Sequence, residues 1–156
     1  MHPNAALIEH FYASFAKRDG TAMAACYTPD ARFNDPVFEL EGATVGAMWQ
    51  MFCDRGNDLK IAWRDARADD ASGSAKWEAR YMFSATGRPV HNVIDAAFTF
   101  RDGRIATHRD TFNLWRWSRM ALGPKGAVLG WTPFVRKAIR EQGRRGLDAW
   151  MARRGR

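Results

Sequence analysis

Residues 27–36 read YTPDARFNDP, which places one carboxylate at the end of a short apolar strand. Turn formers at 28–30 predict a turn leading into a strand over 31–35 that stops at a proline. Alternation along this strand puts Phe33 and Asp35 on one face. Burial of that face would disfavour the charged carboxylate and raise its pKa, as suits a general base near neutral pH. The alternative is that Asp35 only turns the chain before the proline.

The segments on either side have the spacing of helices and strands. Apolar stripes predict helices over residues 5–18, 21–27 and 44–53. Alternating patterns predict strands over 59–68, 74–86, 90–101 and 104–117. Tight turns join these strands, which indicates an antiparallel sheet, and the helices ahead of it indicate an α+β fold class.

The end of the chain differs in composition from this body. Three glycines and a proline over 123–132 predict a loop, and a second proline then begins a last helix. We therefore divide the chain into a domain over 1–122 and a basic loop-and-helix segment over 123–156. Of the net charge of +7, residues 1–115 carry −2 and the remainder carries +9.

Three roles are open for the basic helix. It could pack its apolar stripe on the body or on a partner subunit, bind a nucleic-acid backbone, or rest on an anionic membrane surface through Trp150. We expect the first role, and we expect neither nucleic acid nor a membrane as a partner.

The remaining composition fits one globular domain of 156 residues with ordinary apolar and charged fractions. Two cysteines, Cys26 and Cys53, fall in helix-like segments and read as reduced core residues. The start lacks the pattern of a signal peptide, and no apolar run has the length of a membrane span. We expect a cytoplasmic protein.

Three stretches resemble the nuclear transport factor 2-like superfamily, which includes ketosteroid isomerases, SnoaL-like polyketide cyclases and limonene-1,2-epoxide hydrolases. They are FYASFAKRD at 11–19, YTPDARFNDP at 27–36 and FTFRDGRI at 98–105. The resemblance covers roughly residues 5–117. It implies a cone-shaped α+β barrel, in which a curved antiparallel sheet and N-terminal helices enclose a pocket, with a C-terminal helix added here. It also implies a homodimer formed through the sheet.

The resemblance assigns roles to three residues. Asp35 matches the general base of the isomerases, in the same Asp-Pro context. Asp110, within HRDTFNL at 108–114, matches an aspartate of the epoxide hydrolase triad. Tyr27 matches a supporting tyrosine of the isomerase pocket.

Other positions depart from both patterns. Phe11 stands where the isomerases have their oxyanion-hole tyrosine. Asp95 is the ungapped match to their second donor, but strand alternation turns it to the opposite face from Ile94. The Arg-x-Asp pair of the hydrolases would fall at Trp77 and Ala79. Neither catalytic set is therefore complete.

Strand alternation adds a histidine to these candidates, because His108, Asp110 and Phe112 share one face of the last strand. We take Asp35, Asp110 and His108 as candidate catalytic residues, since two carboxylates in different surroundings can have different pKa values. No spacing of a closed metal site is present, and we expect neither a metal nor a cofactor. The candidate substrate-binding residues are apolar or aromatic, with one amide: Phe11, Tyr27, Phe33, Trp49, Trp77, Tyr81, Asn92, Ile94, Phe98 and Phe112.

Two functions remain open at this point. The first is cofactor-independent acid–base chemistry on a small hydrophobic substrate, by isomerisation, cyclisation or hydrolysis. The second is a non-catalytic module that binds a small molecule or another protein, because the oxyanion donors and the Arg-x-Asp pair are missing. The retained carboxylate favours the enzyme, although a fold by itself does not imply a reaction.

Overall fold

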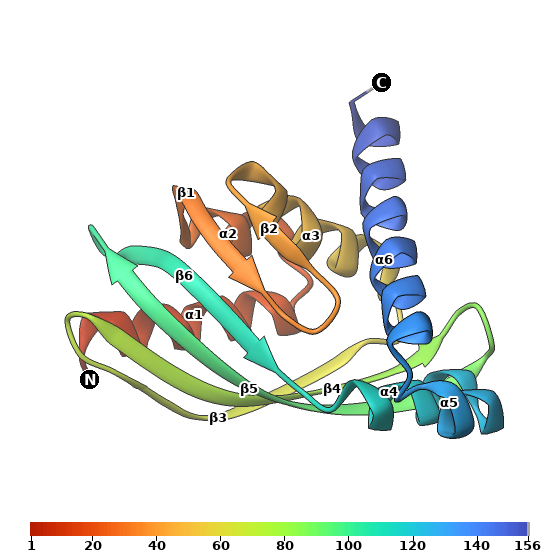
Figure 1. Cartoon of the computed structure of the whole chain (residues 1–156). Helices are drawn as coiled ribbons and strands as arrows, with labels where there is room; N and C mark the ends of the chain where they lie inside the picture. The colour runs from red at the N-terminus through yellow and green to blue at the C-terminus, as the bar shows by residue number, and fades with distance from the viewer. Residues whose placement is uncertain (156) are drawn as a thin grey trace.

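The computed structural model describes residues 1–155. They form six helices and a six-stranded sheet, and three of the helices come before the last four strands in the sequence (Figure 1). Most of the predicted helices and strands are present with small shifts of their ends. The helices are α1 Pro3–Ala16, α2 Gly20–Ala25, α3 Ala43–Arg55, α4 Leu114–Leu122, α5 Pro124–Leu129 and α6 Pro133–Arg154. The strands are β1 Tyr27–Asn34, β2 Glu39–Glu41, β3 Lys60–Ala68, β4 Ser72–Phe83, β5 Arg88–Arg101 and β6 Arg104–Thr111.

The sheet has the order β2-β1-β6-β5-β4-β3 and curves strongly along its long strands (Figure 1). The α+β class and the cone-like arrangement are confirmed, but the sheet is open at β2 and β3 and does not close into a barrel. The pairs are antiparallel except β1 with β6, which run parallel. The predicted hairpin between β5 and β6 forms, with positive φ at Asp102 and Gly103 (54° and 74°), as a type I′ turn requires.

Three local predictions need correction. The strand predicted over 104–117 ends at Thr111, because Asn113 caps helix α4, which begins at Leu114. The predicted turn at 28–30 lies inside β1, where the register with β6 shifts between Tyr27 and Arg32. Such an irregularity suits a stretch that contains a proline, since proline cannot donate to the ladder. The predicted loop over 123–132 contains the short helix α5, which begins at Pro124.

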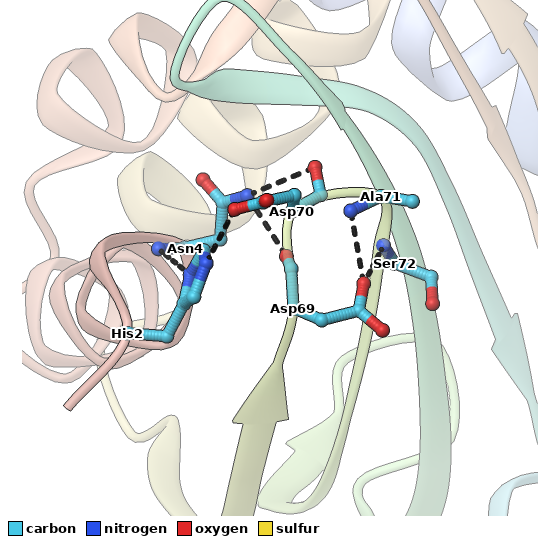
Figure 2. Close-up of polar contacts among 6 residues, drawn as sticks. All are labelled: His2, Asn4, Asp69, Asp70, Ala71 and Ser72. Carbon is cyan, nitrogen blue, oxygen red and sulfur yellow. Dashed lines mark hydrogen bonds and ion pairs between the residues drawn. The ribbon is translucent and has the colours of Figure 1, made fainter.

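The start of α1 is tied to the turn between β3 and β4 (Figure 2). Asp69 Oδ1 accepts hydrogen bonds from the N–H groups of Ala71 and Ser72, at 2.9 and 2.8 Å, and so shapes the turn. Asn4 Nδ2 donates to the Asp69 carbonyl at 3.1 Å. His2 caps the helix, because its Nδ1 accepts from the Asn4 N–H and its Nε2 lies 2.8 Å from Asp70 Oδ1. This anchor sets the position of α1 over the concave face of the sheet.

The concave face is filled with aromatic side chains from the sheet, α1 and α3. The largest fully buried ones are Trp49, Tyr12, Phe11, Phe33 and Phe98. Many of them meet edge to face, as aromatic quadrupoles prefer. The sheet and these helices therefore share one hydrophobic core.

Helix α6 packs against the body, in agreement with the first of its three predicted roles. Leu147 is fully buried and joins the main core, and Trp150 Nε1 donates to Asp54 Oδ2 at 2.9 Å. Nearer its start, Arg140 Nε donates to the Pro36 carbonyl at 2.9 Å. A Cβ at Gly143 would lie 2.8 Å from a methyl carbon of Val37, so the glycine permits this close approach. None of the described helices has the length and apolar character needed to span a membrane.

Replacing Leu147 by Ala should weaken the docking of α6. Large-to-small substitutions at buried leucines cost about 2–5 kcal/mol. We expect a loss of this size in urea unfolding, or faster amide exchange confined to α6 if the helix undocks locally. Leu129→Ala on α5 is the control, because that side chain is 40 % exposed and should matter little. Equal stabilities for the two variants would contradict this account of the helix.

Candidate active site

Asp35 directly follows β1, at the start of the short connection to β2. Its Oδ1 accepts hydrogen bonds from the N–H groups of Val37 and Phe38, at 2.7 and 2.6 Å. The carboxylate therefore does shape the turn. Burial nevertheless raises the pKa of Asp35 to about 6, because desolvation outweighs these two backbone hydrogen bonds; the charge of Asp110 raises it further and His108 lowers it. The turn geometry and the raised pKa are thus both present at Asp35, and its role as a base stays a prediction.

This raised pKa makes stability depend on pH in a definite direction. The folded protein holds the proton of Asp35 up to about pH 6, whereas an unfolded chain releases it near the ordinary value of 3.8. Stability should therefore fall as pH rises from about 4 to about 6, by at most about 3 kcal/mol. Asp35→Asn should remove this fall, so that the variant matches the wild type below pH 4 and exceeds it at pH 7.5. Urea unfolding at several pH values measures the difference; a pH-independent difference would contradict it.

His108 and Asp110 form a buried pair on β6. His108 Nε2 lies 2.8 Å from Asp110 Oδ1, and Trp77 Nε1 donates to the same oxygen at 3.4 Å. On the other side of the ring, His108 Nδ1 lies 2.7 Å from the Tyr27 hydroxyl, which accepts from Trp49 Nε1 at 2.8 Å. Five side chains from four elements, α3, β1, β4 and β6, thus meet in one continuous hydrogen-bonded chain.

The donors of this chain set its proton positions. An indole N–H can only donate, so the Tyr27 oxygen accepts from Trp49 and its own proton is free to go to His108 Nδ1. The imidazole then carries its proton on Nε2 and donates it to Asp110. Every proton in the chain then points toward Asp110, whose Oδ1 accepts from both His108 and Trp77.

His108 itself has no open face. Its ring lies 4.4 Å from the centroid of Phe98 and 5.0 Å from that of Phe33, and it stacks on Trp49 at 5.8 Å. The imidazole is therefore placed to hold Asp110 in position rather than to touch a ligand.

The predicted pocket residues divide into two groups. Seven are buried within the packed core: Phe11, Tyr27, Phe33, Trp49, Trp77, Ile94 and Phe98. The others lie toward the end of the sheet next to α4: Tyr81, Asn92 and Phe112.

Of these three residues, Tyr81 is the one that interacts electrostatically with Asp35. Burial raises the pKa of the Tyr81 phenol, and the negative charge of Asp35 adds to the rise. Trp117 of α4 donates to its hydroxyl at 2.8 Å. Asn92 lies on the concave face of β5, opposite Ala79. The Asp35 carboxylate, the Tyr81 phenol and the Asn92 amide thus lie on the same side of the concave face, next to the side chains that bury the His108–Asp110 pair.

Two residues of the site were missed by the sequence analysis. Tyr12 carries a fully buried hydroxyl that has no hydrogen-bond partner among residues 1–155. Burial raises its pKa well above the ordinary value, and the charge of Asp110 raises it further. The only signal for Tyr12 was its place next to Phe11, where the isomerase tyrosine would fall. Trp117 was missed because the strand prediction ran through 104–117, whereas the chain becomes helical at Leu114.

Asp95 lies where strand alternation predicted, on the opposite face, with Oδ1 2.9 Å from Lys76 Nζ at the surface. Among residues 1–155, no three His, Cys, Asp or Glu side chains are grouped to hold a metal ion.

The curved sheet, with helices and a polar network on its concave face, defines a protein of the nuclear transport factor 2-like class. Residues 8–108 match the model of the SnoaL-like domain family. This match covers more than half of the chain, so the chain belongs to the SnoaL-like family. A comparison with curated proteins found no match.

Several solved structures share the fold. An NTF2-like protein of unknown function from Burkholderia pseudomallei is 18% identical, with a TM-score of 0.65 over 77% of this chain and 98% of its own. An LEH-like epoxide hydrolase from M. tuberculosis is 18% identical, with a TM-score of 0.64 over 84% and 96%. TerC, co-crystallised with polyporic acid, is 17% identical, with a TM-score of 0.64 over 76% and 98%. These identities establish the fold and leave the reaction open.

Proposed function

We propose that the protein performs cofactor-independent acid–base chemistry on a small hydrophobic molecule, with Asp35 as the general base. One observation carries this proposal. Asp35 is a partly buried carboxylate whose Oδ1 is held by two backbone N–H groups, while no described residue donates to its Oδ2. The second oxygen is therefore the one free to accept a proton from a ligand.

The surroundings of Asp35 suit this role. With a pKa of about 6, the carboxylate is mostly ionised at pH 7 and is yet a stronger base than an ordinary aspartate. In an isomerisation it would take a proton from a carbon next to a carbonyl and return it to another carbon. We propose the Tyr81 hydroxyl and the Asn92 amide as the donors to the oxygen that becomes negative. The same base could instead start a cyclisation or activate a water for hydrolysis.

Asp110 has a supporting part in this proposal. Its charge raises the pKa of Asp35, and the His108 hydrogen bond holds its carboxylate in one orientation. The chemistry named for the structural relatives is compatible with this reading, since one is an epoxide hydrolase and another was crystallised with polyporic acid. We further propose that the protein is cytoplasmic and forms a homodimer through the outer face of the sheet. Light scattering would measure the mass of this dimer.

A screen of small apolar enones and epoxides tests the reaction directly. The expected result is turnover of at least one class without an added cofactor, with a rate that rises through about pH 6 as Asp35 ionises. Carboxyl-carbon NMR titration of Asp35 is independent of substrate choice. An ordinary pKa near 3.8 would remove the basis of the proposal.

A second candidate function is a non-catalytic binding module. It is favoured by the packing of the predicted pocket residues, seven of which lie inside the core. It is also compatible with Asp35 serving as a turn residue only. This alternative predicts that a hydrophobic ligand binds the wild type and Asp35→Asn with equal affinity and is recovered unchanged from both.

A further inference from the structure

A cleft of about 680 Å³ opens between the end of α6, the C-terminal part of α3 and the turn that leads into α2. Four arginines line it: Arg18, Arg55, Arg153 and Arg154. Arg18 follows α1 and Arg55 ends α3, and the docking of α6 brings Arg153 and Arg154 to them. The volume falls in the range of small-molecule sites in proteins.

The positive charge of this cleft is not neutralised within residues 1–155. None of the four arginines forms an ion pair with a described Asp or Glu. Arg18 and Arg154 donate only to neutral oxygens, the Asn57 carbonyl and the Gln50 amide. The one acidic side chain in the lining is Asp54, and its Oδ2 already accepts from Trp150. Four like charges thus face one cleft against a single carboxylate.

The geometry points to a binding site for a soluble, phosphate-bearing small molecule in this arginine cleft. Guanidinium groups match phosphate oxygens through paired, charge-assisted hydrogen bonds, and an anion with two or more charges relieves the repulsion among the four arginines. The largely buried indole of Trp150 also lines the cleft, and the Arg154 guanidinium lies over its ring, 5.0 Å from the centroid.

This site is separate from the candidate active site. None of the side chains around Asp35 or the His108–Asp110 pair lines the cleft. Along α6, Arg140 contacts the loop after Asp35, whereas Arg153 lies 13 positions further on, about 20 Å along the helix axis. The inference therefore holds whether or not the protein is an enzyme.

The test is calorimetric titration of the full-length protein with inorganic pyrophosphate. We expect saturable binding that weakens as NaCl is raised from about 0.05 to about 0.5 M, because the ion pairs are exposed to screening. Arg55→Gln/Arg153→Gln should bind at least about tenfold more weakly, since two charge-assisted contacts are lost. The matched control is Lys125→Gln/Lys137→Gln, which removes the same charge outside the cleft and should bind as the wild type does.

Each other outcome would overturn the proposal. Equal weakening in both double variants would mean attraction to overall charge, without a site. Absence of pyrophosphate binding by the wild type would mean that the arginines are only solvated. Binding to phosphatidic-acid vesicles without binding of pyrophosphate would mean a membrane surface in place of a soluble ligand. Unchanged circular dichroism spectra of the two double variants would show that α6 remains folded.

Discussion

Asp35→Asn is expected to lower turnover by about 10²–10⁴-fold while the protein keeps its fold. The asparagine side chain retains an oxygen that can accept from the Val37 and Phe38 N–H groups, so the turn after β1 should persist. It loses the basic oxygen that would take the proton. The substitution therefore separates the observed turn role of Asp35 from its proposed role as a base.

Steady-state kinetics on whichever enone or epoxide is turned over would measure this effect. The matched control is Asp95→Asn, which removes a carboxylate at the surface beside Lys76 and should leave the rate within a factor of two or so. An unchanged rate in Asp35→Asn would eliminate this residue as the base. Asp110 would then be the carboxylate to test next, since it is the other one that reaches the concave face.

Asp110→Ala is expected to have the largest effect on stability, a loss of about 3–5 kcal/mol. The side chain is almost completely buried, and its Oδ1 accepts from both His108 and Trp77. Its removal leaves two buried donors without a partner, and a buried donor that has lost its acceptor bears the full cost of its desolvation. Few replacements are available, because aromatic rings enclose His108.

Urea unfolding at pH 7 would measure this loss, with Asp95→Ala as the control. Asp95 forms an exposed ion pair with Lys76, and exposed pairs contribute about 0–1 kcal/mol. The two aspartates lie on neighbouring strands, so the comparison isolates burial. Similar small losses for both would mean that the His108–Asp110 hydrogen bond contributes little in solution.

Strand alternation carried much of the prediction of the site. It placed His108 and Asp110 on one face of β6 and turned Asp95 to the other face of β5, and both assignments agree with the observed burial. This succeeds because successive side chains in a strand point to opposite faces whatever the strand pairs with. Tyr12 was missed because helical spacing predicts which face of a helix is buried. It does not predict whether a buried hydroxyl on that face has a hydrogen-bond partner.

By itself, the sequence determined the order of the longer helices and strands up to residue 111, the faces of those strands, and the candidate carboxylates, because these depend on local periodicity and turn chemistry. Only the tertiary structure decided which distant residues meet. The parallel pairing of β1 with β6 sets Phe33 opposite His108 and brings Tyr27 within hydrogen-bond distance of the imidazole. The docking of α6 gathers the four arginines into one cleft. Such contacts join segments separated by many residues, and their choice depends on the packing of the whole core, which no local pattern encodes.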